Sequence, residues 1–245
     1  MDSTTKKGFQ LLELLARSNE PRAVTDVARE TGLTRSNVQR TLATLCELGY
    51  ADKDPASSRY FPSLRLWEMG IPVLSRNEIV RAARARLLAV YGATGETTVL
   101  CLRQGQEIVY VNKLESQTPI RMSCGIGTRL PLHATATGRV IAAFLPESER
   151  ASLCQEATDA RADMALADDL AAIRSKGYAV SVGTYRSGVN SIAVPVHAAG
   201  GAVSASIALT GPEERLTSDW MQSQLHRLLD AAARISESLG YRGSA

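Results

Sequence analysis

Apolar side chains recur at helical spacing in three consecutive segments near the N-terminus. Residues 6–16 predict an amphipathic helix whose inward face holds positions 8, 9, 12 and 15. Residues 26–31 predict a second helix, with Thr25 as its N-cap and Gly32 just beyond its end. Residues 35–48 predict a third helix, which Thr34 caps and which buries one apolar stripe, namely Val38, Leu42, Leu45 and Leu48.

Two short strands are expected after these helices. Residues 50–53 and 59–61 have strand composition, and Asp54-Pro55-Ala56-Ser57-Ser58 is typical of the turn between them. A helix that begins at Leu64 is expected to be interrupted by Gly70-Ile71-Pro72. We therefore place a first domain at residues 1–63 and a linker helix at residues 64–78.

The remaining residues, 79–245, mix strands with helices. Helices are expected at 79–91, 135–144, 167–175 and 217–239, and another begins at Pro146. Strands are expected at 97–102, 107–114, 120–123, 179–182, 191–196 and 203–210, and a loop is expected at 125–131. This mixture predicts an α+β domain built around an antiparallel sheet.

The N-terminal elements have the order of a winged helix-turn-helix: helix, helix, glycine-containing turn, helix and hairpin. The third helix begins with side chains suited to base edges, because Arg pairs with guanine, Asn and Gln pair with adenine, and Ser bonds to either. No acidic residue occurs from Thr31 to Leu45. The candidate base-reading residues are Arg35, Ser36, Asn37, Gln39 and Arg40.

Contacts to the DNA backbone are expected from other positions. Amides at the start of the second helix, near Thr25, could bind a phosphate, and Lys53 and Arg59 flank the hairpin. Residues 1–70 contain ten Lys/Arg and nine Asp/Glu, so the placement of charge, and not its sum, favours DNA binding. A helical module that binds a protein partner is the alternative, and it predicts no salt-dependent binding to any duplex.

The amino-acid composition excludes several classes of protein. The chain has 245 residues, of which 44% are hydrophobic and 22% charged, and its net charge is +3. These values are ordinary for a globular protein and exclude a disordered chain, a collagen-like repeat and a disulfide scaffold. The four cysteines are scattered without a CxxC pair, so we expect reduced thiols in a cytoplasmic protein and no metal site. Neither a signal peptide nor a membrane span is expected.

An enzyme is the second alternative. Cys124 and His133 lie nine residues apart, and a Cys–His pair can activate a thiolate. No orienting acid, GxSxG motif or phosphate-binding fingerprint accompanies the pair, so we expect no catalytic residue and no cofactor. We interpret His133 as a hydrogen-bonded structural histidine, and His197 and His226 as surface residues without a partner. We interpret Arg121 and Arg139 as solvated or paired with acids.

The sequence resembles IclR-type bacterial transcription regulators over essentially its whole length. The stretch from Val24 to Leu42 resembles that family's helix-turn-helix, and Gly49-Tyr50 with the hairpin after it also fits. Two downstream segments are more specific. Arg121-Met122-Ser123 followed by GTRLPLHATATGR at 127–139 resembles the opening of the family's effector-binding domain, and GYAV at 177–180 followed by GVNSIAVPV at 188–196 resembles its second hallmark.

The resemblance implies a GAF-like α/β effector-binding domain, joined by the linker helix to the winged domain. It also implies a double-stranded DNA operator, a small-molecule effector that is frequently an organic acid, and a homodimer or homotetramer. The implied effector pocket is lined by Met122, Leu130, Ala136, Thr137, Ser181, Val189, Ser191, Ala208 and Thr210. The family commonly has acidic residues in the segment at 181–185, where this chain has none, so the pocket is expected to be less anionic and more apolar.

We therefore expect a small carboxylate effector, aromatic and hydroxylated acids included. The implied pocket mixes apolar and hydroxyl side chains, which would bury the body of such a ligand and fix its polar groups. Amides at the start of the 135–144 helix could hold the carboxylate. Binding of the effector would bias the spacing of two winged domains through the helices at 64–91.

Overall fold

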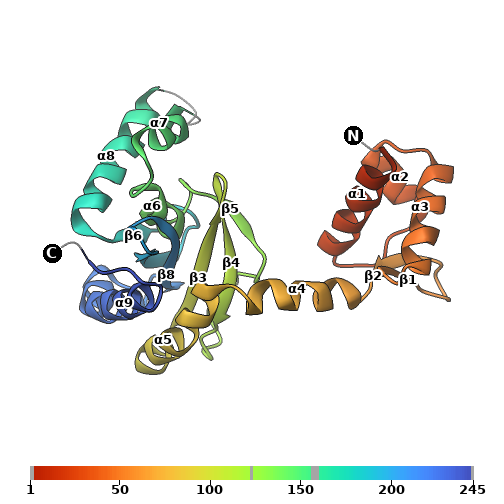
Figure 1. The fold of residues 1–245 in the computed structure, drawn as a ribbon. Helices are drawn as coiled ribbons and strands as arrows, with labels where there is room; N and C mark the ends of the chain where they lie inside the picture. The colour runs from red at the N-terminus through yellow and green to blue at the C-terminus, as the bar shows by residue number, and fades with distance from the viewer. Residues whose placement is uncertain (1–2, 122–123, 156–159, 244–245) are drawn as a thin grey trace. The chain divides into compact units, whose positions relative to one another are not determined.

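The computed structural model describes residues 3–121, 124–155 and 160–243. The chain divides into two compact units, Met1–Leu74 and Ser75–Ala245, and each is described by itself. The first unit contains three helices and a two-stranded hairpin (Figure 1): α1 Ser3–Arg17, α2 Val24–Thr31, α3 Arg35–Glu47, β1 Ala51–Lys53 and β2 Tyr60–Pro62. A further helix, α4, spans Arg65–Ser75.

The core of the first unit forms where the apolar faces of α1, α2 and α3 meet the hairpin. Its fully buried side chains come from all of these elements and include Leu11, Leu15, Val27, Val38, Leu42 and Tyr60. The predicted faces are wrong at two positions, because Phe9 is 63% exposed and Leu48 is 53% exposed. In α1 the inward stripe consists of Leu11 and Leu15, one helical turn apart, and this stripe points Phe9 outward.

The predicted signals at Thr34 and Gly32 agree with the structure, whereas the predicted N-cap of α2 does not. The hydroxyl of Thr34 accepts a hydrogen bond from the Asn37 amide at 3.3 Å, and Gly32 takes the left-handed conformation with φ 70°, as the sequence predicts. The prediction that Thr25 caps α2 is wrong: the helix already includes Val24, and Ala23 stands at the N-cap without a side-chain bond. Val24 packs against the core, and the helix begins two positions earlier than predicted.

Helix α4 continues through the predicted interruption. Gly70 and Pro72 both lie inside it, so the expected break is wrong. Proline removes one amide donor from a helix, but Pro72 lies in the last turn of α4, where only one ladder bond is lost. None of the described α4 side chains is buried, and its large apolar residues are mostly exposed.

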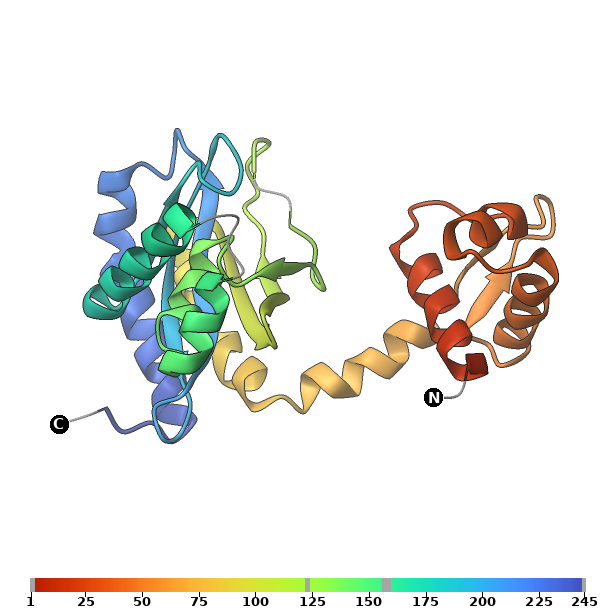
Figure 2. The same ribbon diagram turned by 90° about the horizontal axis from the view of Figure 1, so that it is seen from above.

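The second unit is built on an antiparallel sheet of six strands in the order β5-β4-β3-β8-β7-β6. The strands are β3 Thr97–Gln104, β4 Glu107–Leu114, β5 Arg129–Pro131, β6 Ala179–Val182, β7 Val189–His197 and β8 Val203–Pro212. The helices are α5 Glu78–Thr94, α6 Ala136–Ala142, α7 Glu147–Gln155, α8 Ala160–Lys176 and α9 Ser218–Ser238. Figure 2 shows α6 and α8 on one face of the sheet and α5 and α9 on the other.

Alternation along the strands explains the two layers. Val99 and Cys101 of β3 join one core cluster with Val140 and Ile141 of α6, whereas the intervening Leu100 is buried on the opposite side of the strand. The predicted strand at 120–123 is wrong in its described part, since Ile120 and Arg121 are not in a strand, and Met122 and Ser123 lie outside the described residues. The edge strand is instead β5, within the segment expected to be a loop.

Helix α6 approaches the backbone of the preceding loop very closely. A Cβ added to Gly138 would lie 2.3 Å from the carbonyl oxygen of Leu132 and 2.8 Å from its Cα. Both atoms belong to the main chain, so no side-chain rotation can relieve the overlap. Only glycine at position 138 permits this packing.

We expect Gly138→Ala to lower the free energy of unfolding by about 1–3 kcal/mol, because the added methyl must displace the main chain. Gly92→Ala in α5 is the matched control, since a Cβ at Gly92 meets nothing within 4 Å, and replacing a helical glycine by alanine there should stabilise by about 0.5–1 kcal/mol. Urea unfolding of both variants checks this. Equal stability of the two would contradict the close approach.

Candidate functional site

The N-terminal turn of α3 presents polar side chains while the rest of the helix is anchored. Val38, Leu42 and Leu45 are buried in the core of the first unit, which fixes the rotation of the helix about its axis. This rotation leaves Arg35 and Ser36 exposed in the first turn. The guanidinium of Arg35 has no hydrogen-bond or ion-pair partner among the described residues, so it is available to an external group.

The other predicted base-reading residues are held by neighbours. Arg40 donates to the side-chain oxygen of Asn37 at 3.0 Å, which aligns both along one face of α3. Gln39 donates to the hydroxyl of Tyr60 at 3.0 Å and so connects the helix to the hairpin. These bonds preorient polar groups on a helix that contains no acidic residue before Glu47.

The hairpin and α2 carry the predicted backbone contacts. The two carboxylate oxygens of Asp54 accept bonds from the amides of Ala56 at 3.2 Å and Ser57 at 3.0 Å, so the turn is closed by its own side chain. Arg59 is exposed and donates to the carbonyl oxygen of Pro21 at 3.3 Å, and the exposed Lys53 lies 5.7 Å from the centre of the Tyr60 ring. Thr25 is exposed in the first turn of α2.

In the second unit, strand register gathers most of the predicted pocket residues around one cavity. Ser191 of β7 pairs with Thr210 of β8 and with Ser181 of β6, and Val99 of β3 pairs with Ala208 of β8. The cavity has a volume of about 20 Å³. Six predicted residues line it: Thr137, Ser181, Val189, Ser191, Ala208 and Thr210.

Three predicted residues do not line this cavity. Leu130 and Ala136 pack into the hydrophobic core beside it, and Met122 lies outside the described residues. Five lining residues were missed: Val99, Tyr110, Thr135, Tyr185 and Arg186. Alternation with Cys101 could have indicated Val99, but the positions of Tyr110, Tyr185 and Arg186 depend on strand pairing and on the course of a loop.

Hydroxyl groups dominate the polar lining of the cavity. The hydroxyls of Thr135 and Thr137 lie 2.8 Å apart, and those of Ser181 and Thr184 are hydrogen-bonded to each other. Burial raises the pKa of Tyr110 well above its usual range, so its hydroxyl remains protonated at neutral pH.

A main-chain amide at the start of α6 already has a hydrogen-bond partner within the chain. The amide of Gly138 donates to the hydroxyl of Thr135 at 3.2 Å, and α6 has seven residues. These facts weaken the expectation that its N-terminal amides hold a carboxylate.

The Cys–His alternative finds no support in the geometry. Burial is the largest cause of a raised pKa at Cys124, so this thiol is not activated, whereas His133 is exposed. The structure gives no hydrogen bond between them among the described residues. The interpretation of His133 as a hydrogen-bonded structural residue is wrong, because His133 is exposed and its ring makes no hydrogen bond to the described residues.

Two of the remaining candidates are ion-paired, as interpreted. Arg139 pairs with Asp169 at 2.6 Å and Arg121 pairs with Glu115 at 3.2 Å. His226 is exposed. The interpretation of His197 as a surface residue without a partner is wrong, because its ring stacks on Tyr241 with centroids 4.6 Å apart.

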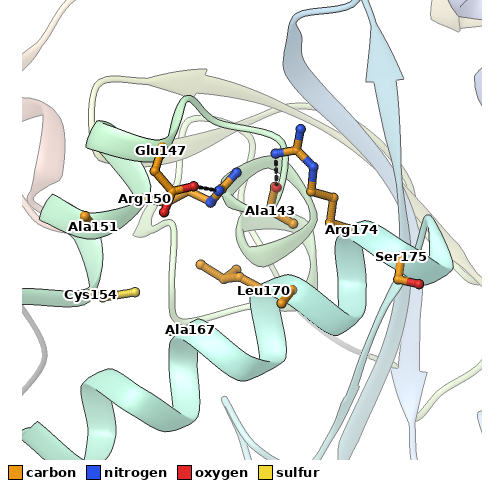
Figure 3. A pocket seen from close by; sticks show the side chains of 10 residues that line it. Ala143, Glu147, Arg150, Ala151, Cys154, Ala167, Leu170, Arg174 and Ser175 are labelled. Carbon is orange, nitrogen blue, oxygen red and sulfur yellow. Dashed lines mark hydrogen bonds and ion pairs between the residues drawn. The ribbon is translucent and has the colours of Figure 1, made fainter. Parts of the chain in front are cut away.

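A larger hollow lies between α7 and α8 beside the end of α6 (Figure 3), with a volume of about 580 Å³. Its walls are mostly small apolar side chains, namely Ala143, Ala151, Ala167, Leu170 and Ala171. Both of its arginines are engaged within the chain: Arg150 donates to the Leu145 carbonyl at 2.9 Å and pairs with Glu147, and Arg174 donates to the Ala143 carbonyl at 3.4 Å. Polar groups converge on the smaller cavity instead.

Within the described ranges, no three His, Cys, Asp or Glu side chains are grouped so that they could hold a metal ion. None of the helices formed by the described residues combines the length and hydrophobicity that a membrane crossing requires.

Comparison with known proteins identifies the family of this chain. The IclR helix-turn-helix model matches residues 4–55, and the model of the C-terminal domain of bacterial IclR transcriptional regulators matches residues 71–237. The Escherichia coli regulator XynR is 31% identical, with 97% of each chain covered. The Escherichia coli repressor AllR is 29% identical, with 97% of this chain and 90% of AllR covered.

Solved structures agree with this assignment. The Thermotoga maritima IclR structure has a TM-score of 0.79 at 29% identity and covers 97% of this chain and 99% of its own. A transcriptional regulator from Rhodococcus has a TM-score of 0.87 at 28% identity, with 98% and 99% covered. The chain therefore belongs to the IclR family, whose members are transcriptional regulators that bind DNA and small-molecule effectors and are not enzymes.

Proposed function

We propose that this protein is a sequence-specific DNA-binding regulator whose affinity for its operator is changed by a small organic acid. One observation carries the DNA part: the first turn of α3 is exposed, free of acidic residues and fixed in orientation by a buried stripe. Arg35 and Ser36 reach base edges in the major groove, together with Asn37, Gln39 and Arg40. Lys53, Arg59 and the start of α2 near Thr25 contact phosphates.

The effector site is the cavity beside α6. Its lining combines Val99, Val189 and Ala208 with hydroxyls from Thr137, Ser181, Ser191 and Thr210. Apolar walls with a few convergent polar groups suit a small acid that has an apolar or aromatic body. Differential binding of this acid to two arrangements of the protein would change operator affinity about 5–150-fold for a coupling of about 1–3 kcal/mol.

The regulator acts on DNA as a homodimer or homotetramer in the cytoplasm. Two α3 helices are needed to read two half-sites on one face of a duplex. The first unit has a hollow of about 570 Å³ between α1, α3 and α4, whose lining includes the base-reading candidates Asn37 and Arg40 as well as three large apolar residues, Phe9, Leu48 and Met69. These three apolar side chains are 63%, 53% and 55% exposed, which is unusual for large apolar residues of one small domain. We assign the three apolar side chains to contact with a second copy of the chain, and we leave Asn37 and Arg40 to the DNA.

Selection of bound duplexes from a random library tests the DNA part. Wild type should enrich two inverted half-sites, and Arg35→Ala should relax one position of each and cost about 1–3 kcal/mol of binding free energy. Arg227→Ala, in the exposed face of α9, is the control and should enrich the wild-type motif. Absence of any motif at low salt, with and without a panel of carboxylates, would refute operator binding.

The dimer surface is tested with duplexes that carry one or two of the selected half-sites. Phe9→Ser combined with Met69→Ser removes exposed apolar contacts without touching a buried core residue, so the unit should still fold. We expect this variant to lose at least about tenfold of the preference for two half-sites, equivalent to about 1.4 kcal/mol. The control is Ile126→Ser, an exposed residue of the second unit. An unchanged preference in the double variant would exclude this face as the contact.

A further inference from the structure

One charged residue stands among the hydroxyls of the cavity. Every other polar side chain that lines it belongs to Ser, Thr or Tyr, and the exception is Arg186. The segment 183–188, which carries Arg186, contains no acidic residue. The cavity therefore has a cationic edge and no anionic one.

Arg186 differs from the arginines around it because it lacks an ion pair. Arg139 pairs with Asp169 at 2.6 Å, Arg215 pairs with Glu96 at 2.5 Å and Arg121 pairs with Glu115 at 3.2 Å. No carboxylate of the described residues lies within ion-pair distance of Arg186. The carboxylate of Glu115 is already paired with Lys113 and with Arg121, both at 3.2 Å.

The segment that carries Arg186 is held at both ends and open between them. The amide of Gly183 donates to the side-chain oxygen of Asn190 at 3.1 Å, and the amide of Val189 donates to the carbonyl of Arg186 at 3.1 Å. Gly183 and Gly188 both have positive φ, a backbone conformation that glycine adopts without strain. Tyr185, 41% exposed, and the exposed Arg186 lie between these ends, where they can move without breaking strand pairs.

The size of the cavity makes such a movement necessary. A volume of about 20 Å³ holds about one water molecule and no organic acid. The walls formed by β3, β7 and β8 are fixed by strand pairing, and α6 is fixed by its contact with Leu132. Of the described residues that line the cavity, only Tyr185 and Arg186 lie outside the paired strands and outside α6 with its N-cap Thr135. We therefore expect their segment to move when a ligand enters.

We propose that Arg186 is the residue that pairs with the carboxylate of the effector and thereby sets its chemical class. Its planar guanidinium donates two parallel hydrogen bonds to the carboxylate, and Tyr185 and Arg186 close together over the bound acid. A single guanidinium balances a single carboxylate. The preferred effector is therefore a monocarboxylate, since the second charge of a dicarboxylate would be buried among hydroxyls without a partner. This inference rests on the proposed acid effector and names the group that binds it.

The test uses the full-length protein and calorimetric titration with matched acids and amides. The pairs are benzoate and benzamide, 3-phenylpropionate and 3-phenylpropanamide, and lactate and lactamide, with isophthalate as the dicarboxylate. Each amide keeps the shape of its acid and loses the charge. The variants are Arg186→Gln and Arg186→Lys, and Arg227→Gln on α9 is the control for loss of an exposed arginine.

We expect at least one acid to bind wild type at least tenfold more tightly than its amide. Arg186→Gln should abolish that difference by weakening the acid alone, Arg186→Lys should restore part of it, and Arg227→Gln should behave as wild type. Isophthalate should bind more weakly than benzoate. Tighter binding of isophthalate would overturn the monocarboxylate class.

The remaining outcomes separate the two proposals. Full retention of the acid preference in Arg186→Gln would overturn the assignment of Arg186 and leave the acid effector standing. Equal binding of acid and amide to wild type, or no binding by any member of the panel, would overturn the acid effector and this inference with it.

Discussion

The close contact between Gly138 and the main chain of Leu132 is the constraint on which the fold of the second unit depends. A helix can approach a loop backbone this closely only where it has no side chain. The approach places α6 against the sheet and directs Thr135 and Thr137 toward β7 and β8, where strand register supplies Ser191, Ala208 and Thr210. The paired strands and α6 thus carry most of the described residues that line the cavity, and the segment between Gly183 and Gly188 carries the other two, Tyr185 and Arg186. We expect the strands and α6 to orient the bound acid and this segment to move to admit it.

In the first unit, buried side chains likewise position the exposed residues that we propose bind DNA. Buried apolar side chains fix the rotation of α3, and hydrogen bonds from Gln39 to Tyr60 and from Arg40 to Asn37 preorganise its polar face. The net charge of this unit is close to zero, so affinity for DNA must come from the placement of a few cations. The exposed apolar residues of α1 and α4 lie outside the core cluster of the unit, and a second copy would explain their exposure.

Periodicity and capping residues predicted most helices and strands because these signals are local. The N-cap at Thr34 and the left-handed Gly32 follow from residue type alone. Errors arose where tertiary contacts decide: Val24 packs into the core and displaces the expected cap, Phe9 is turned outward, and α4 continues past Pro72. Six pocket residues were placed by family resemblance, whereas Tyr110 and Arg186 reach the cavity through strand pairing and a loop path that no single-sequence pattern encodes.

We propose that binding of the operator and binding of the acid are linked by one coupling free energy. Linkage requires that the factor by which the acid changes operator affinity equals the factor by which the operator changes acid affinity. The most direct measurement titrates the acid into the free protein and into the protein saturated with its selected operator. We expect two different dissociation constants, whose ratio matches the change in operator affinity at saturating acid. Identical dissociation constants for the free and the DNA-bound protein would contradict it.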